Sequence, residues 1–114
     1  MEDRSARLMR AALDICLLAL IAEKERYGYE LVRDLGKEDL KLVKEGSIYP
    51  LLRRMEREEL IRGHIVPSED GPARKYYQLL PKGRERLRAW GSEFVQFADA
   101  VKSILKGRVD LEQH

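Results

Sequence analysis

The chain has 114 residues, of which 44% are hydrophobic and 37% are charged, and its formal net charge is +2. This length fits one small domain, and the near-neutral charge means that any affinity for nucleic acid depends on where the basic residues lie. The single cysteine, Cys16, excludes an internal disulfide. The longest apolar run, residues 11–22, is interrupted by Asp14 and is shorter than the roughly 20 residues of a membrane-spanning helix. We therefore expect a cytoplasmic protein that is not inserted in a membrane.

Residues 5–23 are predicted to form a helix that is apolar nearly all round. Leu8, Ala12 and Ile15 follow one another at helical spacing, and Leu18 widens the apolar surface. A helix with such a surface needs neighbours on more than one side, and one layer of a small domain covers only one of them. The other side is covered either within the same domain or, as we favour, by a second chain.

Two shorter helices are predicted next. In "YGYELVRDLGKE" the apolar spacing predicts a helix over about residues 28–35 that Gly36 ends, and residues 40–43 read as a strand stub or an extended connector. In "EGSIYPLLRRMEREELI", Pro50 places the start of a helix within a few residues, and the pattern extends it over about residues 46–60. Two short helices with a tight connector are typical of a helix-turn-helix.

The remaining residues predict a β-hairpin and one long helix. "IRGHIV" and "KYYQLL" alternate apolar and polar residues, and the turn-forming segment "PSEDGPA" lies between them. Pro81 then begins a helix of about 26 residues, which is longer than a small winged helix needs. The predicted fold is mainly α with a small β-hairpin, in a single domain. Residues 5–80 form a winged helix-turn-helix, and residues 81–108 form a C-terminal dimerisation helix.

Metal binding and catalysis find little support in the sequence. His64, His114 and Cys16 are scattered and lack the spacing of metal ligands, and the glycines do not form a phosphate-binding loop. Neither histidine stands near a serine or cysteine in a recognisable nucleophile–base pattern. We therefore expect no metal, no cofactor and no enzymatic activity.

The front of the 46–60 helix carries candidate DNA-binding residues, because the front of the second helix of a helix-turn-helix enters the major groove. Arginine can reach guanine edges or phosphates, and hydroxyl groups can bond phosphates. Adjacent residues on a helix point about 100° apart, so Arg53 is favoured over Arg54, which can instead pair with Glu58. Arg74 and Lys75 flank the hairpin tip, and a lysine there suits the DNA backbone better than a base edge. The candidates are Ser47, Tyr49, Arg53, Arg54, Arg74 and Lys75.

Each of these assignments has a plainer alternative. The charged face is also compatible with a surface that is merely solvated. Tyr49 is either a phosphate contact or a packing residue, and we favour the contact because the neighbouring Pro50 holds it near the start of the helix. Aromatic residues of the last helix most often form a core or a dimer interface, although a ligand pocket within that interface is compatible with both roles. The residues assigned to this dimer seam or effector pocket are Trp90, Phe94, Phe97 and Val101.

Three segments in this order, "YGYELVRDL", "EGSIYPLLRRMEREELI" and "GPARKYYQLLPKGRERL", resemble the PadR family of bacterial transcriptional regulators, over roughly residues 8–105. The resemblance implies a dimeric winged-helix repressor whose last helix packs with the partner's first helix. It implies that paired recognition helices read a palindromic operator in double-stranded DNA. It also implies a small aromatic or cationic effector at the dimer interface that releases the protein from DNA.

Two positions depart from the family pattern. Lys44 and Glu45 stand where serine and proline are common, and Leu80 stands where a threonine is usual. A capping hydroxyl is therefore missing at the start of each of the two helices concerned. The alternative function is a winged helix that docks a protein instead of specific DNA. Salt distinguishes the two, because phosphate contacts weaken steeply and linearly with the logarithm of the salt concentration.

Overall fold

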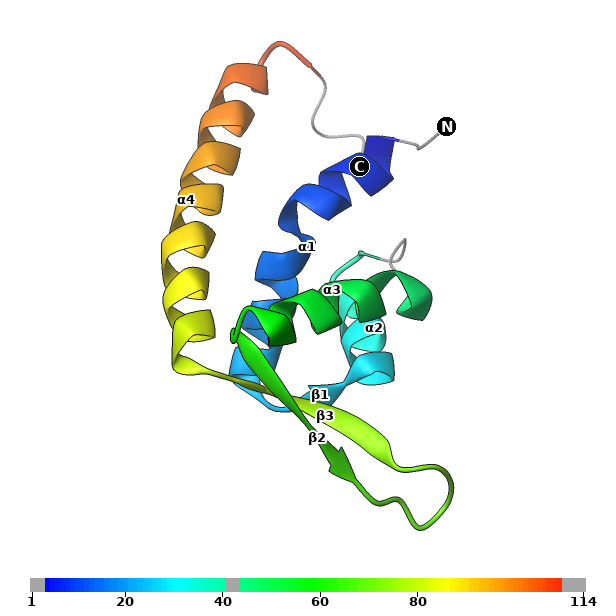
Figure 1. The fold of residues 1–114 in the computed structure, drawn as a ribbon. Helices are drawn as coiled ribbons and strands as arrows, with labels where there is room; N and C mark the ends of the chain where they lie inside the picture. Colours follow the sequence, from blue (N-terminus) through cyan, green and yellow to red (C-terminus); the bar gives the residue numbers. More distant parts are fainter. Residues whose placement is uncertain (1–3, 41–43, 110–114) are drawn as a thin grey trace.

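The computed structural model describes residues 4–40 and 44–109. Within them the elements are α1 (Arg4–Glu23), β1 (Arg26–Tyr27), α2 (Gly28–Lys37), α3 (Glu45–Arg57), β2 (Ile61–Val66), β3 (Arg74–Leu79) and α4 (Pro81–Leu105). The strands form one antiparallel sheet in the order β1–β3–β2. In Figure 1, α1 lies between α4 on one side and the α2–α3 pair on the other, and the β2–β3 hairpin projects below them. This is the mainly helical winged helix-turn-helix that the sequence predicts.

The hydrophobic core lies where α1, α2 and α3 meet one face of the sheet. Leu17 of α1 and Leu31 of α2 are fully buried there. On α3 the buried residues are Ile48, Leu52 and Met55, three to four positions apart, as the helical spacing predicts. This burial seats α3 on the core by one face and leaves its opposite face outside.

The ends of the two helices of the helix-turn-helix differ from the predicted ones. α2 continues through Gly36 to Lys37, so Gly36 does not end it. α3 begins at Glu45 and ends at Arg57, three residues before the predicted end. The early end coincides with Glu59, whose φ of 63° is in the left-handed region and turns the chain toward β2.

Pro50 lies in the second turn of α3, slightly later than predicted. There it removes the N–H that would bond the carbonyl of Gly46, four residues before it. Gly46 is exposed, so that carbonyl can bond water and the cost of the proline is small. Of the strand predicted at 40–43, residues 41–43 lie outside the described residues, and Leu40 belongs to no strand.

The short strand β1 was not predicted from the sequence. It consists of Arg26 and Tyr27, which pair with Tyr77 and Tyr76 of β3. Two residues are too few to show a periodic pattern, so this strand depends on its pairing partner. It leads directly into α2 and thereby fixes where the helix-turn-helix begins.

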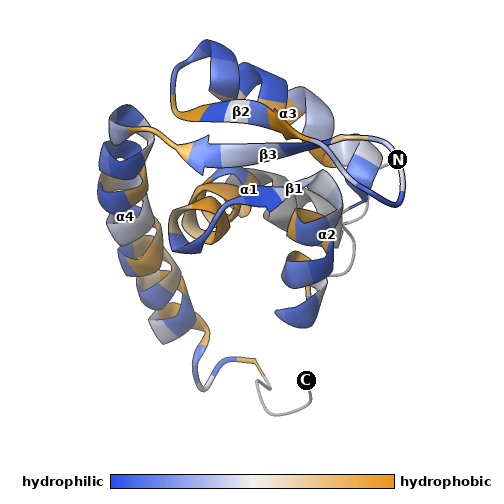
Figure 2. Ribbon diagram, turned by 90° about the horizontal axis from the view of Figure 1, so that it is seen from below, coloured by the Kyte–Doolittle hydropathy of each residue, from blue (hydrophilic) through white to orange (hydrophobic). Residues whose placement is uncertain are grey.

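α4 is 25 residues long and runs beside α1 (Figure 1). Its start lacks the capping hydroxyl, yet Pro81 occupies the first helical position, where no N–H is needed. Gly83 is its buried residue, and hydrophobic residues recur along the rest of the helix, as Figure 2 shows. None of the helices in the described part of the chain combines the length and apolarity that crossing a bilayer requires.

Candidate DNA-binding interface

The outward face of α3 is basic. At 100° per residue, the positions opposite the buried face are Gly46, Pro50, Arg53 and Arg57. All four are exposed, and so is Ser47 at the front of the helix. Arg57 was not among the residues chosen from the sequence, although its spacing of four from Arg53 places it on the same face. This face can present two guanidinium groups to a phosphate or a guanine edge.

The front of α3 is held against α2 by Tyr49. The ring covers Gly28, where any side chain would collide with it. The hydroxyl donates a hydrogen bond of 2.7 Å to the carboxylate of Glu45, and this bond, together with burial, raises the pKa of Tyr49 to about 12. Glu45 in turn suits the positive end of the helix dipole. Tyr49 therefore packs the two helices together, the plainer of the two roles considered for it, and its contact with a phosphate stays a prediction.

Arg54 points away from Arg53 and makes the ion pair considered for it. Its Nε lies 3.6 Å from a carboxylate oxygen of Glu58. The other oxygen of Glu58 accepts a hydrogen bond of 2.9 Å from Arg86 of α4. Arg53, in contrast, stays exposed and lies close enough to Lys75 and Tyr77 of β3 for its charge to act on both. Of the two adjacent arginines, Arg53 is thus the more available for DNA.

The hairpin is tied to α3 through Glu56. Its carboxylate accepts 2.8 Å and 3.2 Å hydrogen bonds from the Nζ of Lys75 and from the N–H of Gly63. The bond to Glu56 raises the pKa of Lys75. Arg74, the neighbour of Lys75, lies with its guanidinium 4.7 Å from the centroid of the Tyr27 ring. Arg74 and Lys75 therefore differ, because Lys75 is paired with a carboxylate and Arg74 is stacked on a ring.

A buried ion pair positions α2 and was not found from the sequence. Arg26 is 4% exposed and donates to Asp34 at 2.6 Å, and it also donates to the Leu20 carbonyl at the end of α1. The pKa of Asp34 is held well below its usual range by hydrogen bonds from Arg33 and from Arg26, although burial opposes this. The pair joins the end of α1 to α2 across β1. Its partners are eight residues apart and lie in two different elements, β1 and α2, so no single periodic pattern reveals it.

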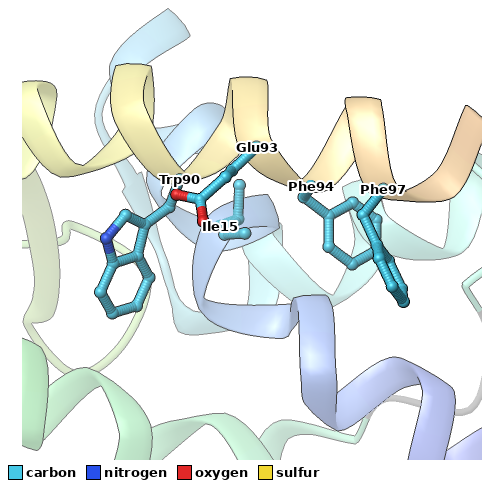
Figure 3. A pocket seen from close by; sticks show the side chains of 5 residues that line it. All are labelled: Ile15, Trp90, Glu93, Phe94 and Phe97. Atoms are coloured by element: carbon cyan, nitrogen blue, oxygen red, sulfur yellow. The ribbon is translucent and has the colours of Figure 1, made fainter. Parts of the chain in front are cut away.

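An open aromatic pocket of about 450 Å³, called the cavity below, lies on the surface between α1 and α4. Figure 3 shows Phe94 and Phe97 side by side at one end and Trp90 at the other. Ile15 of α1 and Glu93 of α4 complete the lining. Aromatic faces beside a carboxylate suit a flat or cationic molecule. The structure thus brings three of the predicted seam residues together, and it adds a carboxylate that the sequence did not single out.

The predicted seam residues form one exposed stripe along α4. Trp90, Phe94, Phe97 and Val101 are spaced by four, three and four residues, and Ile104 continues the series. This alternation is the spacing by which helices pack side by side in coiled coils. Phe97 is 66% exposed and Ile104 is 63% exposed, so the chain itself does not cover the stripe.

Within residues 4–40 and 44–109, His, Cys, Asp and Glu side chains form no group of three or more that is arranged to hold a metal ion.

Comparison with known proteins gives consistent matches. Residues 17–89, which run from α1 into α4, match the transcriptional regulator PadR-like family. The transcriptional regulator Rv3488 of Mycobacterium tuberculosis is 34% identical over 80 residues, or 68% of this chain and 71% of that protein. The crystal structure of a PadR-like transcriptional regulator from Bacillus cereus is 40% identical, with a TM-score of 0.80 over 89% of this chain and 98% of that one. A Streptococcus transcriptional regulator is 39% identical, with a TM-score of 0.75 over 90% of this chain and 98% of that one.

Proposed function

Because this chain belongs to the PadR-like family of transcriptional regulators, we propose that it is a homodimeric repressor of an inverted-repeat operator. As a member of that family it is a DNA-binding regulator of transcription and not an enzyme. The proposal extends this to a DNA-contacting surface, an assembly and a means of release. It assigns DNA binding to residues 5–80 and dimerisation to residues 81–108.

The exposed basic face of α3 is the observation that carries the proposal. It supports placing Arg53 and Arg57 in the major groove, with Ser47 at the front of the helix bonding a phosphate. Arg54 serves as a flanking phosphate contact. Arg74 on the hairpin binds the backbone or the minor groove beside the same half-site, and Lys75, paired with Glu56, holds the hairpin against α3. Arginine at the groove floor specifies a base, whereas the flanking contacts fix register.

The exposed stripe on α4 supports the dimer. A second copy that packs its own α4 and α1 against this stripe removes Phe97 and Ile104 from water in both chains. A two-fold dimer presents two copies of α3 to successive major grooves about 34–36 Å apart. An operator read in this way is an inverted repeat.

The cavity beside Trp90 supports control by a small molecule. A planar aromatic cation fits its rings by stacking and its carboxylate, Glu93, by charge. Since the cavity lies within the stripe assigned to the dimer, an occupant changes how the two chains pack. The expected consequence is release of the operator.

The decisive experiment is selection of bound fragments from a random pool of double-stranded DNA, followed by titration of the enriched sequence at several salt concentrations. We expect an enriched palindrome, with an affinity that falls linearly in the logarithm of salt. A scrambled duplex of equal length is the matched control and should bind more weakly. Failure to enrich any sequence, together with no binding at low salt, would overturn the proposal.

A further inference from the structure

Arg86 connects the aromatic cavity to the end of α3. Its Nη1 donates a 2.9 Å hydrogen bond to Glu58, the residue that caps the C-terminus of α3. Its guanidinium carbon also lies 4.6 Å from the centroid of the Trp90 ring, which lines the cavity. One side chain therefore contacts both the recognition helix and the wall of the cavity.

The corner at which this contact occurs is tightly packed. Gly83, in the first turn of α4, lies so close to Leu60 that any side chain at position 83 would collide with the Leu60 carbonyl. The same carbonyl accepts a 3.0 Å hydrogen bond from the N–H of Leu80. The first turn of α4 thus lies directly on the segment that leaves α3, and Arg86 is one turn further along. If the Arg86 side chain moves, the effect reaches the end of α3 directly, through its hydrogen bond to Glu58.

Glu58 is shared between two arginines. It is 2.9 Å from Arg86 and 3.6 Å from Arg54, so the closer ion pair is the one with α4. One carboxylate cannot neutralise both guanidinium groups fully. While Arg86 holds Glu58, Arg54 is left with the weaker contact and is 53% exposed. When Arg86 leaves, Glu58 is free to hold Arg54 alone.

We propose that Arg86 is a positioning residue that couples the cavity to DNA binding through Glu58 and Arg54. A planar aromatic cation bound beside Trp90 competes with Arg86 for the ring and repels its guanidinium, so that Arg86 moves away from Glu58 as well. Glu58 then retains Arg54, and one phosphate contact is lost. This inference rests on the proposed function, because it requires that α3 bind DNA. Coupling of this kind is reciprocal, so DNA that draws Arg54 away from Glu58 must also tighten Arg86 and alter the surroundings of Trp90.

A double-mutant cycle tests the coupling. Arg86→Gln should weaken operator binding by about two- to fivefold, the range of an exposed ion pair. The double variant E58Q/R86Q should bind as E58Q does, because Arg54 then has no carboxylate to return to. Arg88→Gln is the control, since it removes the same charge from an exposed position of the same helix. Its effect should add to that of Glu58→Gln, and circular dichroism checks that every variant is folded.

Fluorescence supplies a second readout, because Trp90 is the only tryptophan of the chain. Operator DNA should change the emission of the wild type and of R88Q, and it should leave that of E58Q unchanged. Additive effects of the 58 and 86 substitutions, with an equal change of emission in E58Q, would overturn the coupling while DNA binding stands. A wild type that binds no DNA at low salt would overturn the proposed function, and the coupling with it.

Discussion

The winged-helix half of the molecule buries its hydrophobic residues, whereas α4 leaves many of its own exposed to water. In the first, Leu17, Leu31 and Leu52 are each 0% exposed, inside a core that this chain completes by itself. In the second, Phe97 and Ile104 are 66% and 63% exposed on a helix of 25 residues. The two regions thus use the same kinds of residue for different purposes. The first region specifies the fold of one chain, whereas the second leaves apolar surface exposed, which we propose a second chain covers.

The difference in burial between α3 and α4 follows from what each helix packs against. α3 meets α2, β2 and the core along one face, so a single row of aliphatic residues is enough for it. α4 contacts α1 on one side and extends past it (Figure 1). Burying apolar surface contributes about 25 cal/mol of free energy per Å². The long exposed stripe of α4 could therefore contribute a large free energy if a second chain covered it.

Phe97→Asp should have the largest effect and tests the need for a partner directly. The change places two unpaired carboxylates in the seam of the dimer, at a cost of several kcal/mol for each buried charge. We expect sedimentation to show a folded monomer where the wild type is a dimer at micromolar concentration. Val95→Asp is the matched control, because Val95 is exposed but lies outside the stripe. A wild type that stays monomeric at high concentration would remove the distinction between the two regions.

Asp34→Asn tests whether the winged-helix half is complete in itself. It removes one of the two carboxylates that Arg26 bonds and leaves Glu23 at 2.6 Å, so it should cost about 1–3 kcal/mol of the free energy of unfolding. The pKa of Asp34 is lower in the folded chain than the value of about 3.9 expected when unfolded. The contribution of the pair is therefore present in full above about pH 5 and is lost progressively as the pH falls below about 4.

Urea denaturation at several pH values measures this effect. The stability of the wild type should fall between about pH 5 and pH 2, and that of D34N should fall less steeply over the same window. Equal slopes for the two proteins would show that other carboxylates govern the acid response.

Leu52→Ala contrasts the two regions by stability. Leu52 is fully buried, so the loss of its side chain should cost about 2–5 kcal/mol. Ile104→Ala removes a residue of similar size from α4 and should cost less than about 0.5 kcal/mol, because Ile104 is exposed within one chain. Both are best measured in a monomeric F97D background, where dimerisation does not contribute to unfolding. A large loss for I104A in that background would mean that the chain itself covers its stripe.

Arg53→Ala should weaken operator binding without changing the fold. If Arg53 reads a guanine, the cost should be about 1–3 kcal/mol, with relaxed preference at one position of each half-site. If it holds a phosphate, the loss should be uniform across sequences. Titration of the operator and of single-base variants decides between these outcomes. If R53A binds every duplex with wild-type affinity, the DNA-binding interface does not lie on this face of α3.

The parts of the fold that follow from periodicity were predictable from the sequence. The buried face of α3, the two strands of the hairpin and the apolar stripe of α4 each repeat at a spacing that only one kind of element produces. The predicted ends of α2 and α3 were less accurate, because the chain turns after each helix at Asp39 and at Glu59, which adopt positive φ without being glycine. Such residues terminate helices through the path of the chain and leave no pattern in the sequence.

The candidate site was predictable only in part, because its residues are joined by contacts between distant segments. Glu56 meets Lys75 across 19 residues, and Arg86 meets Glu58 across 28. The sequence identifies such residues as charged, but it does not say which charges pair. It therefore supplied Arg53 and the pairing of Arg54 with Glu58, and it missed Arg57 and the pairing of Lys75 with Glu56.

Lys75→Ala should have the smallest effect on DNA binding. It tests whether the hairpin, at the edge of the winged-helix half, contacts DNA through Lys75. From the sequence alone, Lys75 is a backbone contact whose loss lowers the salt slope of binding by about one. In the structure its Nζ is 2.8 Å from Glu56, so its charge is already neutralised within the chain. We therefore expect K75A to lose less than about 1 kcal/mol and to keep the wild-type slope. Glu56→Gln should release Lys75 and steepen the slope by about one, and E56Q/K75A should return it to the wild-type value. Should K75A lower the slope instead, Lys75 exchanges Glu56 for a phosphate when DNA binds, and the hairpin is then part of the reading surface rather than a support for α3.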